Sequence, residues 1–388
     1  RWIDIPAAVF CFSPALTSVV NEINGSGWYD GMSVALTQVV TWGLPYLIGR
    51  AYFDDIDGLK ELAIGIFIGG IIYMPLCWFE MRMSPQLHNL FYGFHQHDFR
   101  QTIRFGGYRP MVFMQHGLMV GMWMAMTTLI GLWLWRSGTI ERMFDLPLGV
   151  LVALLAVTAV ACRSTYASFL LLLGCFTLFS ARWLRTKWLI VGLLAIPPLF
   201  MFVRGTGMVD GMGAVELSKQ IFGDERGGSL ETRVVAENAL SEKARERPWF
   251  GWGGWERSRV SDENGVPYIT DSLWIITFGT AGIVNLAALT IMLLMPMILI
   301  MKDYRVEFWS HPMIAPAVVL ATICMLYMFD HLMNGMVNPI FMLAVGGVCS
   351  AHFKLPSRLP APELYRAMQQ RGMRAMPTQP AYAMRGHS

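Results

Sequence analysis

The chain has 388 residues, of which 54% are hydrophobic and 15% are charged, with 30 Lys and Arg against 27 Asp and Glu. Soluble domains carry about 25% charged residues, so this composition excludes an ordinary soluble enzyme and a disordered chain. The formal net charge of +3 is too small to indicate a nucleic-acid-binding protein.

Ten apolar blocks follow one another along the chain. Because about 20 apolar residues in a helix cross a bilayer, we expect each block to form a membrane-spanning helix. The blocks cover residues 2–20, 31–49, 61–79, 111–135, 146–162, 166–181, 188–204, 272–301, 312–329 and 333–351. The sequence therefore predicts an all-α, polytopic membrane protein, with one transmembrane domain of about ten helices over residues 1–351.

The distribution of Lys and Arg among the short connections predicts the orientation, since cytoplasmic loops are enriched in both. Basic residues fall in the connections 50–60, 136–145, 182–187 and 302–311 and in the tail 352–388, which we assign to the cytoplasm. The two long connections, 80–110 and 205–270, then lie outside, with 205–270 between the seventh and eighth helices. The Pro-rich tail is expected to be a disordered cytoplasmic extension that contacts anionic membrane lipids.

The connection 80–110 contains several histidines and arginines. His95 and His97 fit no common zinc spacing, so we expect a solvated loop and no metal site. The six cysteines lie in apolar blocks without CxxC spacing and suggest no metal either. Arg104 and Arg109 flank a pair of glycines, a pattern that suits anion binding.

Arg163 lies between two apolar blocks and is the one basic residue in the short outer connections. An arginine at that depth is costly unless it extends to the interface or has a partner. Two interpretations follow: Arg163 reaches the headgroup region, or it binds an anion at the outer surface.

The connection 205–270 begins with several glycines, which predict a flexible start. Residues 230–247 predict a helix for which Ser229 is a suitable N-cap. Arg233 and Glu237 lie four residues apart on that helix, so the two side chains can pair on one face.

Residues 248–255 hold three Trp and three Gly in eight positions. One interpretation is an aromatic belt at the membrane interface. The other is a platform for sugars or lipids, since Trp faces stack on apolar sugar faces and Gly lets the backbone approach closely. Asp271 and Ser272 then precede the eighth apolar block. Asp271 suits a helix N-cap, and a carboxylate at the membrane boundary also suits a general base.

Several of these segments resemble the bacterial O-antigen ligase and polymerase family. The late signature of that family is a His, a small polar residue, nine further residues and a Gly-x-x-Gly ending. Here Asp271 and Ser272 are followed by nine residues and by Gly282, so Asp271 stands where the family has His. Five other segments are also similar to family positions: Arg233, the turn at 247–253, Arg163 with Ser164, residues 105–110 and the final helix over residues 330–347.

The resemblance implies a membrane glycosyltransferase on the periplasmic side of the bacterial inner membrane. Such an enzyme transfers a glycan from a polyprenyl diphosphate carrier to a sugar hydroxyl of a glycan or lipid-glycan acceptor, without cofactor or metal. It implies Asp271 as general base, with Arg163 and Arg233 converging on one cavity to bind the donor diphosphate. Further substrate contacts are expected from Arg104, Arg109, Arg247, Trp252, Gly253 and Ser272. Family members commonly have about twelve helices, so two more are expected before Arg1.

Two other functions stay open. A transporter or flippase for lipid-linked sugars would perform no bond chemistry, and broken helices in an inverted repeat would favour it. The cell-wall glycan polymerases also have ten helices and a long loop between the seventh and eighth.

Overall fold

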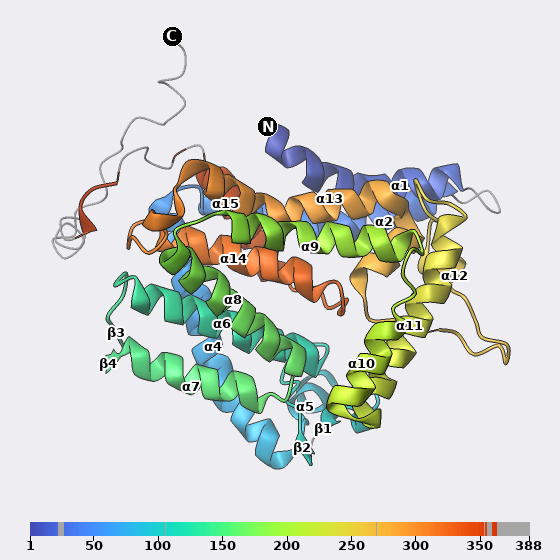
Figure 1. The fold of residues 1–388 in the computed structure, drawn as a ribbon, viewed down its shortest axis with the longest axis horizontal. Helices are drawn as coiled ribbons and strands as arrows, with labels where there is room; N and C mark the ends of the chain where they lie inside the picture. Colours follow the sequence, from blue (N-terminus) through green and yellow to red (C-terminus); the bar gives the residue numbers. More distant parts are fainter. Residues whose placement is uncertain (22–26, 105, 269, 353, 355–358, 363–388) are drawn as a thin grey trace, which may run out of the picture. The chain divides into compact units, whose positions relative to one another are not determined.

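The computed structural model describes residues 1–21, 27–104, 106–268, 270–352, 354 and 359–362, and its regular structure is almost entirely helical (Figure 1). Two short antiparallel strand pairs, β1 with β2 and β3 with β4, complete it. In chain order the elements are η1 (Trp2–Asp4), α1 (Ile5–Val20), α2 (Gly27–Gln38), η2 (Val39–Gly43), α3 (Leu44–Tyr52), α4 (Ile56–Met83), α5 (Leu87–Tyr92), η3 (Phe99–Thr102), β1 (Ile103–Arg104), β2 (Gly107–Tyr108), α6 (Gly117–Arg136), β3 (Arg142–Met143), β4 (Leu146–Pro147), α7 (Leu148–Ala161), α8 (Thr165–Leu184), α9 (Trp188–Gly205), α10 (Met212–Phe222), α11 (Asp224–Arg245), α12 (Trp255–Ser258), α13 (Leu273–Asp303), η4 (Val306–Phe308), α14 (Ala315–Asp330) and α15 (Pro339–Ala351).

Seven helical segments of the described chain are long and apolar enough to cross a membrane. They are Trp2–Val20, Gly27–Tyr52, α4, α6, α8, α9 and α13. Three shorter apolar helices, α7, α14 and α15, correspond to the remaining predicted blocks. The prediction of an all-α chain with the helices of a multi-pass membrane protein is therefore confirmed at this level.

Two helices start six residues later than predicted, and capping residues explain both. The helix predicted from residue 111 begins at Gly117, because the His116 ring caps α6 by accepting a hydrogen bond from the Leu118 N–H at 3.0 Å. The helix predicted from residue 333 begins at Pro339, because the Asn338 side chain accepts from the Ile340 N–H at 3.1 Å. A turn therefore precedes each of these helices.

The connection 205–270 is more ordered than predicted. Its glycine-rich start contains α10, and the Asp210 carboxylate accepts a hydrogen bond from the first N–H of that helix at 3.0 Å. The helix predicted over residues 230–247 is α11, which begins at Asp224 and ends at Arg245. Residue 229 therefore lies inside α11 and is not its N-cap.

The helices form two compact units, which are described separately. One unit comprises Arg1–Leu44, Gly192–Leu293 and His331–Gly335. Within it α1 packs against α2, and α10 packs against α11. We call it the α11 unit, because it contains α11 together with α10.

The other unit comprises Pro45–Val191, Leu294–Asp330 and the described residues of Met336–Ser388. Its centre is α6, which packs against α4, α7, α8 and α14 (Figure 1). Every residue of α14 is buried, so this helix is apolar all round because protein surrounds it. We call it the bundle unit. Of the predicted tail, residues 353, 355–358 and 363–388 lie outside the described residues.

Candidate functional site

Arg233 of α11 and Asp271, two residues before α13, form an ion pair in the α11 unit. Arg233 Nη2 lies 3.5 Å from Asp271 Oδ2, and Arg233 Nη1 donates to the Met333 carbonyl at 3.4 Å. Both side chains are partly exposed, Arg233 by 32% and Asp271 by 43%. Segments separated widely in the sequence thus meet at two of the three predicted catalytic residues.

The start of α13 shows that Asp271 is not the capping residue. The helix begins at Leu273, and the Ser272 carbonyl accepts the hydrogen bond from the Ile276 N–H at 3.3 Å. Ser272 therefore occupies the cap position. The Asp271 carboxylate faces Arg233, where it remains accessible to a ligand.

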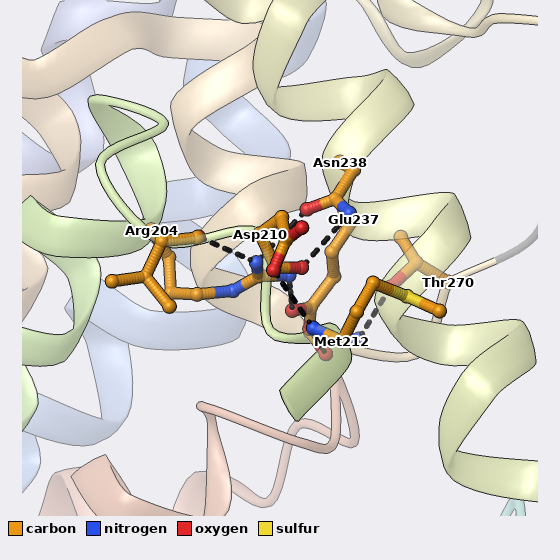
Figure 2. A network of polar contacts seen from close by, with 8 residues as sticks. Arg204, Asp210, Met212, Glu237, Asn238 and Thr270 are labelled. Atoms are coloured by element: carbon orange, nitrogen blue, oxygen red, sulfur yellow. Dashed lines mark hydrogen bonds and ion pairs between the residues drawn. The ribbon is translucent and has the colours of Figure 1, made fainter. Parts of the chain in front are cut away.

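A second ion pair, Arg204 with Glu237, lies near the first and is buried. Arg204 Nη2 lies 3.3 Å from Glu237 Oε2, and both side chains are almost fully buried. Ser272 Oγ donates to Glu237 Oε1 at 2.6 Å, and Arg204 also donates to Asn238 Oδ1 at 2.9 Å. Figure 2 shows Arg204, Glu237 and Asn238 pointing toward one another. Each polar group of this network therefore has a partner, as burial requires.

The buried network contains a residue close to each member of the exposed ion pair. Glu237 lies one helical turn after Arg233, and Ser272 is the neighbour of Asp271. The pairing of Arg233 with Glu237, considered from their spacing, is wrong, because each has a partner from another segment. Ser272, predicted to contact substrate, is buried and its hydroxyl is donated to Glu237.

The Trp- and Gly-rich segment joins α13 through its backbone. The N–H groups of Trp252 and Gly253 donate to the carbonyls of residues 279 and 280, both at 2.9 Å. Helix α13 is broken at Gly282, which has a φ of +73°, and a Cβ there would overlap the Trp249 backbone. The break in α13 at Gly282 therefore lies where the Trp- and Gly-rich segment packs against the helix.

Two cations lie against the Trp252 ring. Lys243 Nζ is 3.8 Å from the ring centroid, and the Arg247 guanidinium carbon is 4.3 Å from it. Arg247 also contacts the Asn21 side chain. Trp252 is therefore occupied by cation–π contacts, whereas Trp249 is 67% exposed.

The remaining predicted arginines lie in the bundle unit. Arg163 has a φ of +54°, and its Nη1 donates to the Arg104 carbonyl at 2.7 Å. Arg109 is buried and its Nη2 donates to the Arg163 carbonyl at 3.0 Å. The structure thus brings Arg109 to the backbone of Arg163 and Arg163 to the backbone of Arg104, at the connection between α7 and α8. The convergence of Arg163 with Arg233 stays a prediction.

Sequence reasoning missed a buried carboxylate in the same unit. Glu80, near the end of α4, accepts hydrogen bonds from the N–H groups of Leu87 at 2.9 Å and of Met111 and Val112 at 2.7 Å. A Glu inside an apolar helix is the signal that marks it. Glu80 ties both ends of the connection between α4 and α6 to the helix.

His331 was also missed, in the turn that contacts the start of α13. Its carbonyl accepts from the Trp274 N–H at 3.3 Å, and its ring lies 5.9 Å from that of Trp42. Burial lowers the pKa of His331 to about 4, so the imidazole is neutral at neutral pH.

The loop histidines have local partners. His95 contacts the Pro85 carbonyl at 3.1 Å, and the His97 ring lies 4.9 Å from that of His116. Across the residues that the structure describes, no group of three or more His, Cys, Asp or Glu side chains is arranged to hold a metal ion.

Comparisons of this chain with protein-family models, with curated proteins and with solved structures found no match.

Proposed function

We propose that this chain is a membrane glycosyltransferase of the O-antigen ligase and polymerase type, with Asp271 and Arg233 at its reacting centre. The observation that carries the proposal is their ion pair at the start of α13. It supports the proposal because a carboxylate and a guanidinium at one exposed point supply a proton acceptor and a diphosphate ligand. The signature spacing from Asp271 to Gly282 supports it independently.

The proposed step is a displacement at the anomeric carbon of the donor sugar. The acceptor hydroxyl gives its proton to an Asp271 oxygen as its own oxygen bonds to that carbon. The bond from the carbon to the polyprenyl diphosphate breaks, and the diphosphate leaves with the electron pair. Arg233 stabilises the negative charge that grows on the leaving group. Asp271 then releases its proton to water.

In the absence of the donor, Arg233 and Asp271 pair with each other, so the guanidinium in the resting site lies against the carboxylate. A diphosphate that binds Arg233 competes with Asp271 for the guanidinium donors. Donor binding therefore releases Asp271 to act as the base, and the acceptor hydroxyl can then reach it.

The arginines of the bundle unit are proposed to bind phosphate as well. Arg104 is exposed, Arg163 donates to the Arg104 carbonyl, and Arg109 donates to the Arg163 carbonyl. Arg forks grip phosphate oxygens with two parallel hydrogen bonds, which suits a diphosphate lipid.

For topology, we propose ten membrane spans, cytoplasmic termini and periplasmic connections 80–110 and 205–270 in a bacterial inner membrane. The contacts within each unit support this assignment, because each joins connections on the same predicted side. On the cytoplasmic side Lys354 contacts Asp54, and Thr139 donates to the Pro312 carbonyl at 3.1 Å. On the outer side Arg257 donates to Asp30 at 3.3 Å.

The experiment that tests the proposal is a transfer assay with the purified protein in proteoliposomes. The substrates are a glycan on polyprenyl diphosphate and a glycan acceptor, and the products are an extended glycan and free polyprenyl diphosphate. Release of the carrier together with extension supports the transferase. An intact donor that moves across the bilayer without extension would instead establish a transporter.

A further inference from the structure

Helix α5 presents large apolar side chains on one face. Leu87 and His88 are buried against the protein, whereas Leu90 is 75% exposed and Phe91 66% exposed. Tyr92 and Phe94 continue this exposed surface. Residues 90–94 thus form an apolar surface outside the membrane-spanning helices, which we call the α5 patch.

Aromatic contacts place the α5 patch beside a spanning helix. The Phe113 ring lies 5.2 Å from Phe91, 6.4 Å from Tyr92 and 6.5 Å from Tyr73 of α4. Tyr73 lies ten residues before the end of α4, which is about 15 Å along the helix axis. The patch therefore lies alongside the last turns of α4 and not beyond its end.

The length of α4 places this level at the membrane boundary. The helix has 28 residues, so it is about 42 Å long, and the hydrocarbon core is about 30 Å thick. The predicted span 61–79 ends six residues, or about 9 Å, after Tyr73, so this level lies within two helical turns of the membrane boundary. Trp78 and Phe79, farther along α4, are exposed apolar residues as well.

The residues that follow the α5 patch in the sequence are charged and exposed to water. Asp98 and Arg100 form an ion pair at 2.9 Å, and the Arg100 side chain is 88% exposed. An exposed ion pair so close to the patch indicates that the chain has returned to water. Aromatic residues followed by charged ones are the pattern of a segment at the headgroup level.

We propose that the α5 patch is a membrane anchor. It lies in the headgroup–acyl boundary of the leaflet at the carboxyl end of α4, with phospholipid as its partner. Because Glu80 ties the same connection to α4, the anchor and the carboxylate together hold this connection against the membrane surface. The proposal requires only that the protein spans a membrane and does not depend on the proposed transferase activity.

The test is the depth of a nitroxide label in lipid vesicles. Single cysteines replace Leu90, Phe91 or, as the matched control, the exposed Gln96, and the full-length protein is reconstituted in vesicles of phosphatidylethanolamine and phosphatidylglycerol. Five of the six native cysteines are buried, and the signal of labelled wild-type protein is subtracted.

We expect labels at Leu90→Cys and Phe91→Cys to collide with oxygen and to be several-fold less accessible to a water-soluble nickel chelate than the label at Gln96→Cys. Nickel accessibility at residues 90 and 91 equal to that at residue 96 would overturn the proposal. Low accessibility to both reagents would also overturn it, because protein and not lipid would then cover the patch.

Discussion

At the residue scale, the charges around α11 pair with partners far away in the sequence. Arg233 meets Asp271, and Arg204 meets Glu237, with one pair partly exposed and the other buried. The difference in exposure separates two roles. The buried pair has no room for a ligand and positions its neighbours, while the exposed pair can exchange a protein partner for a substrate.

The geometry of a guanidinium predicts the result of a conservative change at Arg233. In Arg233→Lys the ammonium can still contact Asp271 but cannot grip a diphosphate through two parallel hydrogen bonds. We expect transfer to fall by about 10²-fold or more, with the thermal stability retained. The measurement is product formation in proteoliposomes. Arg257→Lys, at a basic residue of the same connection, is the control, and near-normal transfer by Arg233→Lys would refute the role of the fork.

His331 predicts a pH dependence of stability. In the folded protein its pKa is lowered to about 4, whereas an exposed His titrates near 6.5. Between those values the unfolded chain binds a proton that the folded one does not. Stability is therefore lost as pH falls from about 6.5 to about 4, by at most about 3 kcal/mol. His331→Gln should reduce the dependence of Tm on pH in this window, and an unchanged dependence would contradict the assignment.

At the scale of elements, most helices were predictable and their ends were not. Every apolar block corresponds to a helix, because the length of an apolar run is a local property. The start of α6 depends on the His116 ring and the start of α15 on Asn338, so the extent of the apolar run alone places both starts too early. The helix α10 was missed because its glycines suggested a flexible chain.

The site was predictable only in part, for a related reason. Asp271 and Arg233 stand out by position and by resemblance to a signature. The buried ion pair beside them, Arg204 with Glu237, joins α9 to α11, and no spacing rule connects the two helices. Arg204 at the end of an apolar block was the available signal, since a buried guanidinium needs a partner.

At this scale, the hydrogen bonds of Glu80 predict that its side chain stabilises the connection between α4 and α6. Glu80→Ala leaves three backbone N–H groups without the acceptor that they have in the folded protein. We expect a loss of stability of about 3 kcal/mol or more, measured as a fall in Tm in detergent. Glu61→Ala, at an exposed carboxylate of the same helix, should have little effect. Equal Tm values for the two variants would show that Glu80 does not anchor the connection between α4 and α6.

At the scale of the whole molecule, the orientation in the membrane decides whether the candidate site can meet its substrates. We expect Glu263→Cys, in the connection 205–270, to react with an impermeant thiol reagent in intact spheroplasts. Arg142→Cys, in a predicted cytoplasmic connection, should react only after the membrane is opened. Protection of residue 263 in intact spheroplasts would contradict the proposed orientation.

The central claim is that Asp271 accepts the proton of the acceptor hydroxyl. Asp271→Asn keeps the size and a hydrogen-bonding group but cannot accept a proton as a carboxylate does. Because Ser272 and not Asp271 occupies the cap position, the variant should fold and insert normally, so a loss of turnover reports on the chemistry.

The deciding measurement is the turnover of purified Asp271→Asn on a polyprenyl diphosphate-linked glycan, beside Glu263→Gln, which changes an exposed carboxylate of the same connection. We predict that Asp271→Asn retains the wild-type Tm and loses about 10²-fold or more in turnover, while Glu263→Gln retains both. Wild-type turnover by Asp271→Asn would contradict the account and would assign the base to another residue.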